Sequence, residues 1–460
     1  MRFAKLTIDA LSFWVGAIVA SAFWLMLGRA RPAIKDLREK WQKRRAAAAL
    51  RESSSVEEKH RQAILNTAQG MHLAAPLFSL DEILVPPKLV APPPQIEPGD
   101  EFVAEDQTNL SVPYLPQDSR LAAFYRTETL TLTEALSGGT HLALMGHAGT
   151  GKSVALAHIA TLSAKQDPAL GKLAKAIPFL LHIADIDLPT QNKGDLLAPL
   201  VTHFSANASL FHAARIPKFV QLSFEQGRAL LLLDGLDELP QNEIAESVAY
   251  LKTLLEEYPA IRVVTTTTFD YLDELLTLEF APLTVKAWDQ AEQKTFLDRW
   301  GSLWKSYVSL EAWVQAGPEQ VDPILLNSWI HEDSAHFSPL ELTLKTWGAY
   351  AGDGRGGTPL AAIETHLLRL SPNDIPIAAL ETLAMQANLS EHPVFDAREA
   401  RGWIKSFEPP EEEIPANDEE NGEEARKEVK PHRGLLTKMH ESGLLTKHSD
   451  NRLRFIHPLF

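Results

Sequence analysis

The chain contains no cysteine among its 460 residues. That absence excludes disulfide bonds, a catalytic thiolate and any zinc site built on cysteine ligands. A net positive charge is lacking too, since 60 acidic residues outweigh 44 basic residues and give a formal charge of −16. Proteins that bind nucleic acids in general present a basic surface to the phosphates, so we expect no nucleic-acid partner.

The remaining composition is that of an ordinary folded protein. Apolar residues make up 45% of the chain and charged residues 23%, so most of it can bury a core. A length of 460 residues gives room for two to four domains, at about 150 residues per domain.

A long uncharged apolar run occupies residues 11–27, which is about the minimum length for crossing a hydrocarbon core. Trp14 and Trp24 lie near its ends, where aromatic belts are found. Residues 29–45 hold eight basic and two acidic side chains, a local charge of +6. The positive-inside rule then predicts a single-pass membrane protein with residues 30–460 in the cytoplasm. A cleaved signal peptide is the alternative.

Composition divides the first quarter of the chain into three segments. We expect a transmembrane anchor at residues 1–30 that contacts the lipid bilayer through residues 11–27. Residues 31–74 are rich in helix-forming residues and predict a juxtamembrane helix, standing off the membrane as a stalk. Residues 75–119 include a proline-dense stretch, so we interpret them as an extended linker lying along a folded domain.

Apolar strand-like runs alternate with helical segments over residues 120–288. The runs lie at residues 141–146, 177–184, 229–234, 262–267 and 282–288. They are almost entirely apolar, which is typical of strands buried on both faces of a parallel sheet. The sequence therefore predicts an α/β domain with a mostly parallel sheet flanked by helices.

Beyond that domain the pattern becomes mainly helical. We expect a helical domain at residues 289–372 and a second small domain at residues 373–460 that ends in a strand pair. Residues 408–430 are too acidic and too poor in apolar residues to pack, so we interpret them as a disordered loop within the second domain.

The stretch GHAGTGKS matches the phosphate-binding pattern G-x-x-x-x-G-K-[ST], and it follows a predicted strand and precedes a predicted helix. Its glycines let successive backbone N–H groups face one anion, and the helix N-terminus adds partial positive charge. Lys152 is expected to reach the β and γ phosphates, and the Ser153 hydroxyl to ligate Mg²⁺. The predicted nucleotide-binding residues are Gly146, His147, Ala148, Gly149, Thr150, Gly151, Lys152, Ser153 and Val154.

A second motif, LLLLDGLDEL, supplies the carboxylates that such a site needs. Asp234 directly follows four leucines, so it lies at the end of a buried strand, where it is expected to hold Mg²⁺ together with Ser153. Asp237 and Glu238 follow in the same turn, and one of them is expected to polarise the attacking water. The candidate catalytic residues are Lys152, Asp234, Asp237 and Glu238.

The pairing of GHAGTGKS with GRALLLLDGLDELP resembles the NACHT NTPases of the STAND class of P-loop signalling ATPases. The resemblance extends over about residues 120–460 and implies ATP or ADP with Mg²⁺ as ligands. It also implies that the helical domain is followed by a winged-helix domain.

Three further features follow from this resemblance. The stretch FSPLELTLKTW is similar to the family segment whose proline packs on the adenine, which implicates Pro339. The stretch RFIHPLF is similar to the winged-helix segment whose histidine contacts the β-phosphate of ADP, which implicates His457. Thr268 stands where the family usually has an arginine near the γ-phosphate, and this departure predicts slow hydrolysis and a weaker response to the γ-phosphate.

The resemblance implies a membrane-anchored switch in which ATP binding and slow hydrolysis control self-association, in signalling or defence. ADP is expected to hold the closed form through His457. Two alternatives stay open, a nucleotide-binding scaffold without turnover and a motor ATPase of the AAA+ type. Family members usually continue into a sensor region, so we expect the sequence to be a fragment of a longer chain.

Overall fold

The structure, a computed structural model, describes residues 55–92, 129–188, 195–206, 208–308, 337–352, 358–371, 375–390, 393–408, 434–457 and 459–460. The chain divides into two compact units, Met1–Lys59 and His60–Phe460, and the fold set out below is that of the second unit. The expected membrane span at residues 11–27 lies outside the described residues, as does nearly all of the acidic loop. Among the described residues, no helix is both long and apolar enough to cross a membrane.

The centre of the core is a sheet of seven strands in the order β2-β1-β7-β3-β6-β5-β4. Neighbouring strands from β7 to β4 are parallel, whereas β1 pairs antiparallel with both β2 and β7. The strands are β1 Lys88–Val90, β2 Leu130–Thr131, β3 His141–Met145, β4 Ile177–His182, β5 Ala229–Asp234, β6 Arg262–Thr267 and β7 Phe280–Val285. The five strands expected from the apolar runs are confirmed, although β7 begins and ends earlier than residues 282–288.

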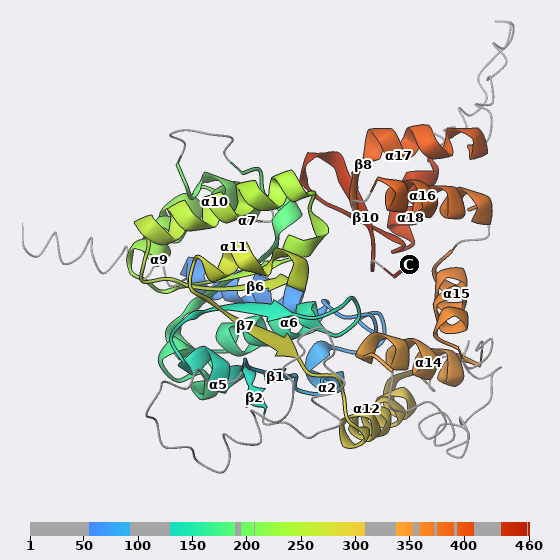
Figure 1. Ribbon diagram of the computed structural model, residues 1–460, viewed down its shortest axis with the longest axis horizontal. Coiled ribbons are helices and arrows are strands. Elements are labelled where there is room, and N and C mark those ends of the chain that lie inside the picture. The colour runs from blue at the N-terminus through green and yellow to red at the C-terminus, as the bar shows by residue number, and fades with distance from the viewer. Residues whose placement is uncertain are drawn as a thin grey trace, which may run out of the picture. The chain divides into compact units, whose positions relative to one another are not determined.

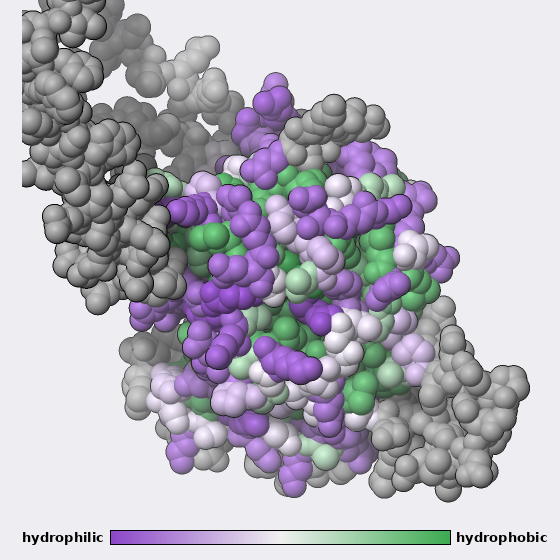
Figure 2. Space-filling view, turned by 90° about the vertical axis from the view of Figure 1, so that its left-hand side faces the viewer, coloured by the Kyte–Doolittle hydropathy of each residue, from purple (hydrophilic) through white to green (hydrophobic). Residues whose placement is uncertain are grey.

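Helices cover both faces of this sheet. In Figure 1, α9 (Ile216–Glu225) and α10 (Gln241–Glu257) lie on one side of the strands, and α5 (Leu132–Ser137) and α6 (Lys152–Ala164) lie on the other. Strands β4 and β5 are buried along their whole length, as their apolar sequences predict. Figure 2 shows one outer face of the molecule, where hydrophilic residues predominate and apolar side chains appear between them.

The segment expected to be a linker is instead partly built into the core. Helix α2 (Leu80–Ile83) packs on α12 (Gln290–Leu303), and β1 joins the sheet with Leu89 opposite Val285 and fully buried. The described end of the expected stalk is helical over residues 60–69, but it too packs on the core. His60 Nε2 lies 2.8 Å from the carbonyl oxygen of Pro178, and Arg61 Nη1 donates to the Ser163 carbonyl at 2.6 Å.

The mainly helical region begins with α12 and continues through α14 (Pro339–Ala351) and α15 (Pro359–Leu370). Its core is aromatic, with Trp300 fully buried between Trp304 and Trp347. Phe78 packs against Trp300 with ring centroids 5.2 Å apart. Side chains from residues 74–85, 296–308 and 337–347 therefore share one hydrophobic cluster, although these segments lie far apart in the sequence.

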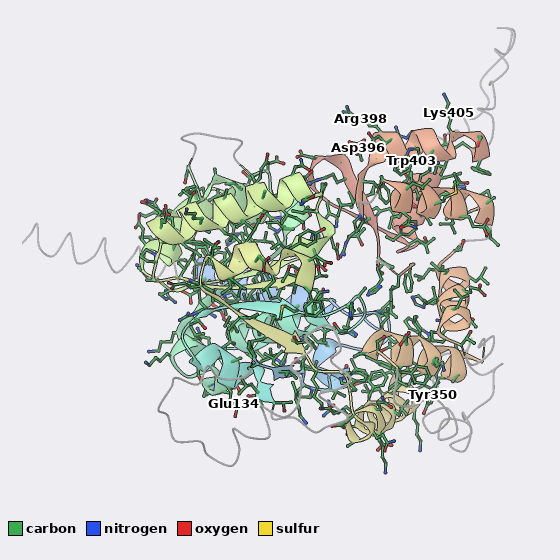
Figure 3. The ribbon with its side chains drawn as sticks, in the orientation of Figure 1. Glu134, Tyr350, Asp396, Arg398, Trp403 and Lys405 are labelled. Carbon is green, nitrogen blue, oxygen red and sulfur yellow. The ribbon has the colours of Figure 1, made fainter. Side chains whose placement is uncertain are left out.

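The described residues from 375 to 457 form a region of three α-helices and a three-stranded antiparallel sheet in the order β8-β10-β9. Its elements are α16 Ile377–Leu389, β8 Val394–Asp396, α17 Ala397–Ile404, α18 Leu435–Glu441, β9 Leu445–Lys447 and β10 Arg452–Phe455. We call it the C-terminal unit. Figure 3 shows Arg398 of α17, and Lys405 directly after that helix, projecting outward. Leu383, Met439 and Leu453 lie in the core of the unit. The expected strand pair is confirmed as β9 and β10, and β8 was not predicted.

Candidate functional site: a phosphate-binding cavity

The loop between β3 and α6 has the backbone of a phosphate-binding loop. Gly149 and Gly151 adopt positive φ angles of +82° and +95°, a region that residues with a Cβ atom rarely occupy. At Gly146 an added Cβ would lie 2.5 Å from the hydroxyl oxygen of Thr150. Thr150 itself donates to the carbonyl oxygen of His147 at 2.8 Å and closes the turn. The loop thus delivers the chain to the N-terminus of α6, whose N–H groups attract anions.

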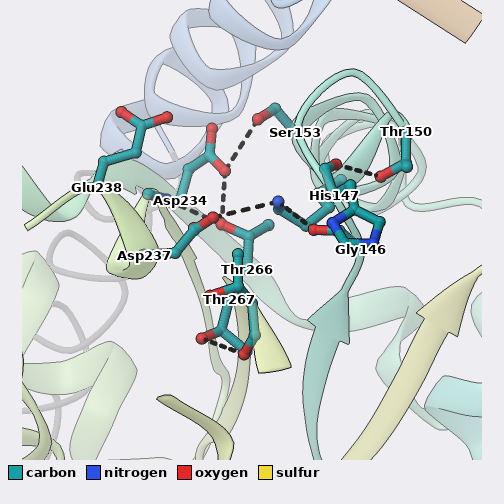
Figure 4. Close-up of polar contacts among 12 residues, drawn as sticks. Gly146, His147, Thr150, Ser153, Asp234, Asp237, Glu238, Thr266 and Thr267 are labelled. Atoms are coloured by element: carbon teal, nitrogen blue, oxygen red, sulfur yellow. Dashed lines mark hydrogen bonds and ion pairs between the residues drawn. The ribbon is translucent and has the colours of Figure 1, made fainter. Parts of the chain in front are cut away.

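Lys152, the first residue of α6, is held by two acceptors. Its Nζ atom donates to the Gly146 carbonyl at 2.6 Å and lies 3.2 Å from Asp237 Oδ2 (Figure 4). Burial raises the pKa of Asp237, and the nearby charge of Lys152 opposes that rise. The ammonium group is therefore fixed beside the loop rather than extended into solvent.

Ser153 and Asp234 come together as expected of a Mg²⁺ site. Ser153 Oγ donates to Asp234 Oδ1 at 3.0 Å, and Thr266 Oγ1 donates to the same oxygen at 2.7 Å. Thr266 also accepts from the Gly235 N–H at 2.8 Å. Strand β6 lies between β3 and β5 in the sheet, so it places Thr266 where it orients the buried Asp234 carboxylate. A hydroxyl and a carboxylate, completed by water and phosphate oxygens, suit the oxygen coordination of Mg²⁺.

Glu238 is held by residues from two different parts of the chain. His182 Nε2, at the end of β4, lies 3.1 Å from Glu238 Oε2. Arg454 Nη1, on β10 of the C-terminal unit, donates to Oε1 at 2.7 Å and to Oε2 at 2.6 Å. Burial alone would raise the pKa of Glu238, but the hydrogen bond from His182 and the charge of Arg454 outweigh it and lower the pKa to about 2.

One cavity of about 480 Å³ collects the candidate residues. Except for Gly146, every residue predicted for the site lines it, including Pro339 and His457. Pro339 begins α14, and the next residue, Leu340, donates its N–H to the Gly149 carbonyl at 3.2 Å. The start of α14 is thus hydrogen-bonded directly to the phosphate-binding loop.

His457 reaches the cavity from the residues after β10. Burial lowers its pKa to about 4, and the charges of Arg454 and Lys152 act in the same direction while Glu238 opposes them. The imidazole is therefore neutral near pH 7, and its Nδ1 atom accepts from the Leu459 N–H at 3.1 Å. Thr268, by contrast, caps the short helix Phe269–Tyr271 and is not among the residues that line the cavity.

Several lining residues were not predicted from the sequence. Thr266 and Arg454 belong to strands that the apolar pattern identified, but nothing in that pattern marked their side chains. Residues 70–74 and 80–87 form another part of the wall and come from the segments expected to be stalk and linker. The apolar residues of the stretch LFSLDEILV already indicated that this segment contacts a folded domain.

A loop of this geometry between a strand and a helix, with an aspartate at the end of a nearby parallel strand, defines a P-loop NTPase core. Residues 140–303 match the family model described as NACHT domain. The match covers this range and not the whole chain, and we call residues 140–303 the NACHT domain. The expected resemblance is confirmed over this range.

Two solved structures also align with the chain. The Aeropyrum pernix ORC1 protein in complex with DNA is 11% identical, with 73% of this chain and 86% of that chain covered and a TM-score of 0.29. Drosophila ORC bound to DNA is 12% identical, with 79% and 93% covered and a TM-score of 0.29. Scores this low carry no argument about function. No curated protein matches the chain.

Proposed function

We propose that the protein is a switch that binds ATP or ADP with Mg²⁺ and hydrolyses ATP slowly. The observation that carries this proposal is the composition of the cavity. It joins the phosphate-binding loop and Asp234 of the NACHT domain to Pro339 of the helical region and His457 of the C-terminal unit. A nucleotide in this cavity would contact all three parts at once. ATP and ADP, which differ by one phosphate, would therefore stabilise different arrangements of the three parts.

The candidate residues divide the chemistry between them. Lys152 and the loop amides would neutralise the phosphates, Ser153 and Asp234 would hold Mg²⁺, and Pro339 would pack on the base. Because Asp237 pairs with Lys152, we assign the general base to Glu238. In hydrolysis a water oxygen would bond to the γ-phosphorus while the bond to the ADP oxygen breaks, and Glu238 would take the proton.

The C-terminal unit supplies the moving part of this proposal. We infer that it is a winged-helix domain, and its order of helix, strand, two helices and two-stranded hairpin supports this inference. With ADP bound, His457 would hold this unit on the NACHT domain; with ATP bound, the unit would swing away and allow self-association. Residues 11–27 would anchor the switch in a membrane, with residues 30–460 in the cytoplasm. Its role would be in signalling or defence.

The test uses the full chain, because residues 60–90 contribute to the sheet and to the cavity. ATP turnover and nucleotide affinity are measured for the unaltered protein and for Lys152→Ala, Asp234→Asn and Glu238→Gln. Lys152→Ala is expected to weaken binding at least about 10-fold, whereas Glu238→Gln is expected to keep binding and lose turnover. Binding that is unaffected by Lys152→Ala would rule out this site.

A second candidate function is a scaffold that binds nucleotide without turnover. It is favoured by Thr268, which offers no cationic side chain to a γ-phosphate. Turnover in the unaltered protein no higher than in Glu238→Gln, with normal affinity, would establish the scaffold instead of the hydrolase.

A further inference from the structure

The hairpin β9–β10 of the C-terminal unit carries two arginines that reach the NACHT domain. Arg452 donates to Glu243 at 2.9 Å and to the Ala184 carbonyl at 2.7 Å. Arg454, which lies on the same strand, donates to both carboxylate oxygens of Glu238. The two contacts belong to one interface, but only the second involves a residue to which we assign a step in hydrolysis.

The tautomer of the neutral His182 ring can be assigned from its neighbours. Its Nδ1 atom accepts from the Ala184 N–H at 3.2 Å, so in the neutral ring the proton is on Nε2. That Nε2–H group therefore donates to Glu238, 3.1 Å away. His182 in turn packs against His448 with the rings tilted and their centroids 4.4 Å apart, and His448 Nδ1 lies 2.8 Å from Asp185 Oδ1.

Glu238 thus receives hydrogen bonds from both sides, and both of its oxygens are engaged. A general base must have free lone pairs directed at water and a pKa near the working pH. Three hydrogen-bond contacts occupy most of the carboxylate's lone-pair sites, with only Oε1 keeping one to spare. The same contacts outweigh burial and hold the pKa of Glu238 at about 2, far below the working pH. The other charged or titratable groups that face it are Asp237 and His457.

We propose that Arg454 is a positioning residue that withholds Glu238 from hydrolysis for as long as β10 rests on the NACHT domain. Departure of the C-terminal unit would remove the guanidinium and leave Glu238 with His182 alone. The carboxylate would then be more basic and would have an oxygen available for water. This inference rests on the proposed ATP hydrolysis, and it explains slow turnover by the Arg454–Glu238 pair rather than by Thr268.

The experiment compares steady-state ATP hydrolysis by the full chain and by Arg454→Gln. The variant is expected to raise kcat about 10-fold with little change in KM, since the pair acts on the base and not on nucleotide binding. Arg454→Lys keeps the positive charge and is expected to stay near the unaltered rate. The double variant Arg454→Gln with Glu238→Gln is expected to lose the gain, which shows that the gain passes through Glu238.

The pH profile of kcat separates this effect from simple loosening of the interface. With Glu238 released, its pKa rises, so the activity of Arg454→Gln is expected to fall as the pH drops to about 5, whereas the unaltered protein keeps a flat profile there. Arg452→Gln removes the neighbouring anchor without touching Glu238 and serves as the matched control. It is expected to leave the profile flat.

Three results would overturn the inference. One is a kcat for Arg454→Gln at or below the unaltered value in protein whose melting temperature shows that it is folded. Another is an equal gain and an equal profile for Arg452→Gln. The third is a gain that persists without the Glu238 carboxylate. If Lys152→Ala and Asp234→Asn do not reduce hydrolysis or binding, the proposed function itself fails, and that outcome is distinct from all three.

Discussion

The NACHT domain and the C-terminal unit contribute to the same cavity in different ways. The NACHT domain offers the backbone of the phosphate-binding loop, the Lys152 side chain, and carboxylates at or just after the end of a buried strand, as with Asp234 at the end of β5. The C-terminal unit, which has its own core, offers Arg454 from strand β10 and His457 from the residues just after it. The backbone of the first set is fixed by the folded sheet, whereas the second set can be broken by moving one unit.

Energetics support this division. Each Å² of apolar surface that the buried strands remove from water stabilises the NACHT domain by about 25 cal/mol, and this stabilisation is spread over the whole sheet. A more exposed ion pair such as Arg452–Glu243 contributes only about 0–1 kcal/mol. A nucleotide that binds two states with different affinity can therefore shift the C-terminal unit without threatening the NACHT fold.

The largest expected effect comes from a change at Gly235 in the NACHT domain. This residue has a φ of +78°, and an added Cβ would overlap the imidazole ring of His182. Gly235→Ala is therefore expected to lower the free energy of unfolding by about 2–4 kcal/mol, through backbone strain and displacement of His182. Urea denaturation followed by circular dichroism measures the change.

The matched control for that change lies in the C-terminal unit. Gly402 is in helix α17, and nothing lies within 4 Å of the position its Cβ would take. Gly402→Ala is expected to leave stability unchanged or to raise it by up to about 1 kcal/mol, because alanine favours a helix. Equal stability of the two alanine variants would show that the contact between Gly235 and His182 is not tight.

The sequence predicted the NACHT domain better than it predicted the walls of its cavity. Strands β3 to β7 are long apolar runs, and the phosphate-binding loop is a local pattern, so neighbouring residues suffice to identify both. Strand β1 is three residues long in a proline-dense stretch, and its partner β7 lies almost two hundred residues later. Pairing over such a separation leaves no local periodicity, which is why residues 80–90 were interpreted as a linker.

The Arg454–Glu238 pair was missed for a related reason. Arg454 stands in RFIHPLF beside His457, and a charged residue in a short strand usually faces solvent. Its direction depends on how the C-terminal unit docks, through the hairpin residues Ser449 and Arg452 that bind Asp185 and Ala184. Docking geometry of this kind belongs to tertiary structure and not to the pattern of any one segment.

A smaller effect is expected from pH, acting through His457. Its pKa is 6.5 in the unfolded chain and about 4 in the fold, so between these values the unfolded chain binds more protons. Stability contributed by the neutral ring is thus complete above pH 6.5 and is lost as the pH falls toward 4. From pH 7 to pH 5.5 the loss from this one residue is about 1 kcal/mol.

The measurement is the free energy of unfolding at several pH values for the unaltered chain and for His457→Asn. The asparagine cannot be protonated, so the variant is expected to lose about 1 kcal/mol less between pH 7 and 5.5. His141 and His366, whose pKa values burial also lowers to about 4, remain in both proteins and contribute to the residual slope. Identical pH profiles for the two proteins would contradict burial of His457 against the NACHT domain.

The smallest effect is expected where the two parts meet through Arg452 and Glu243. These side chains are 19% and 36% exposed and lie 2.9 Å apart, so solvent screens their attraction. A double-mutant cycle of Arg452→Gln and Glu243→Gln is expected to give a coupling energy of about 0.5 kcal/mol that shrinks in 0.5 M salt. A coupling above about 2 kcal/mol, insensitive to salt, would mean that this interface is as fixed as the NACHT core. The C-terminal unit would then be a permanent part of the domain, because a contact of that strength would hold it in place whichever nucleotide was bound.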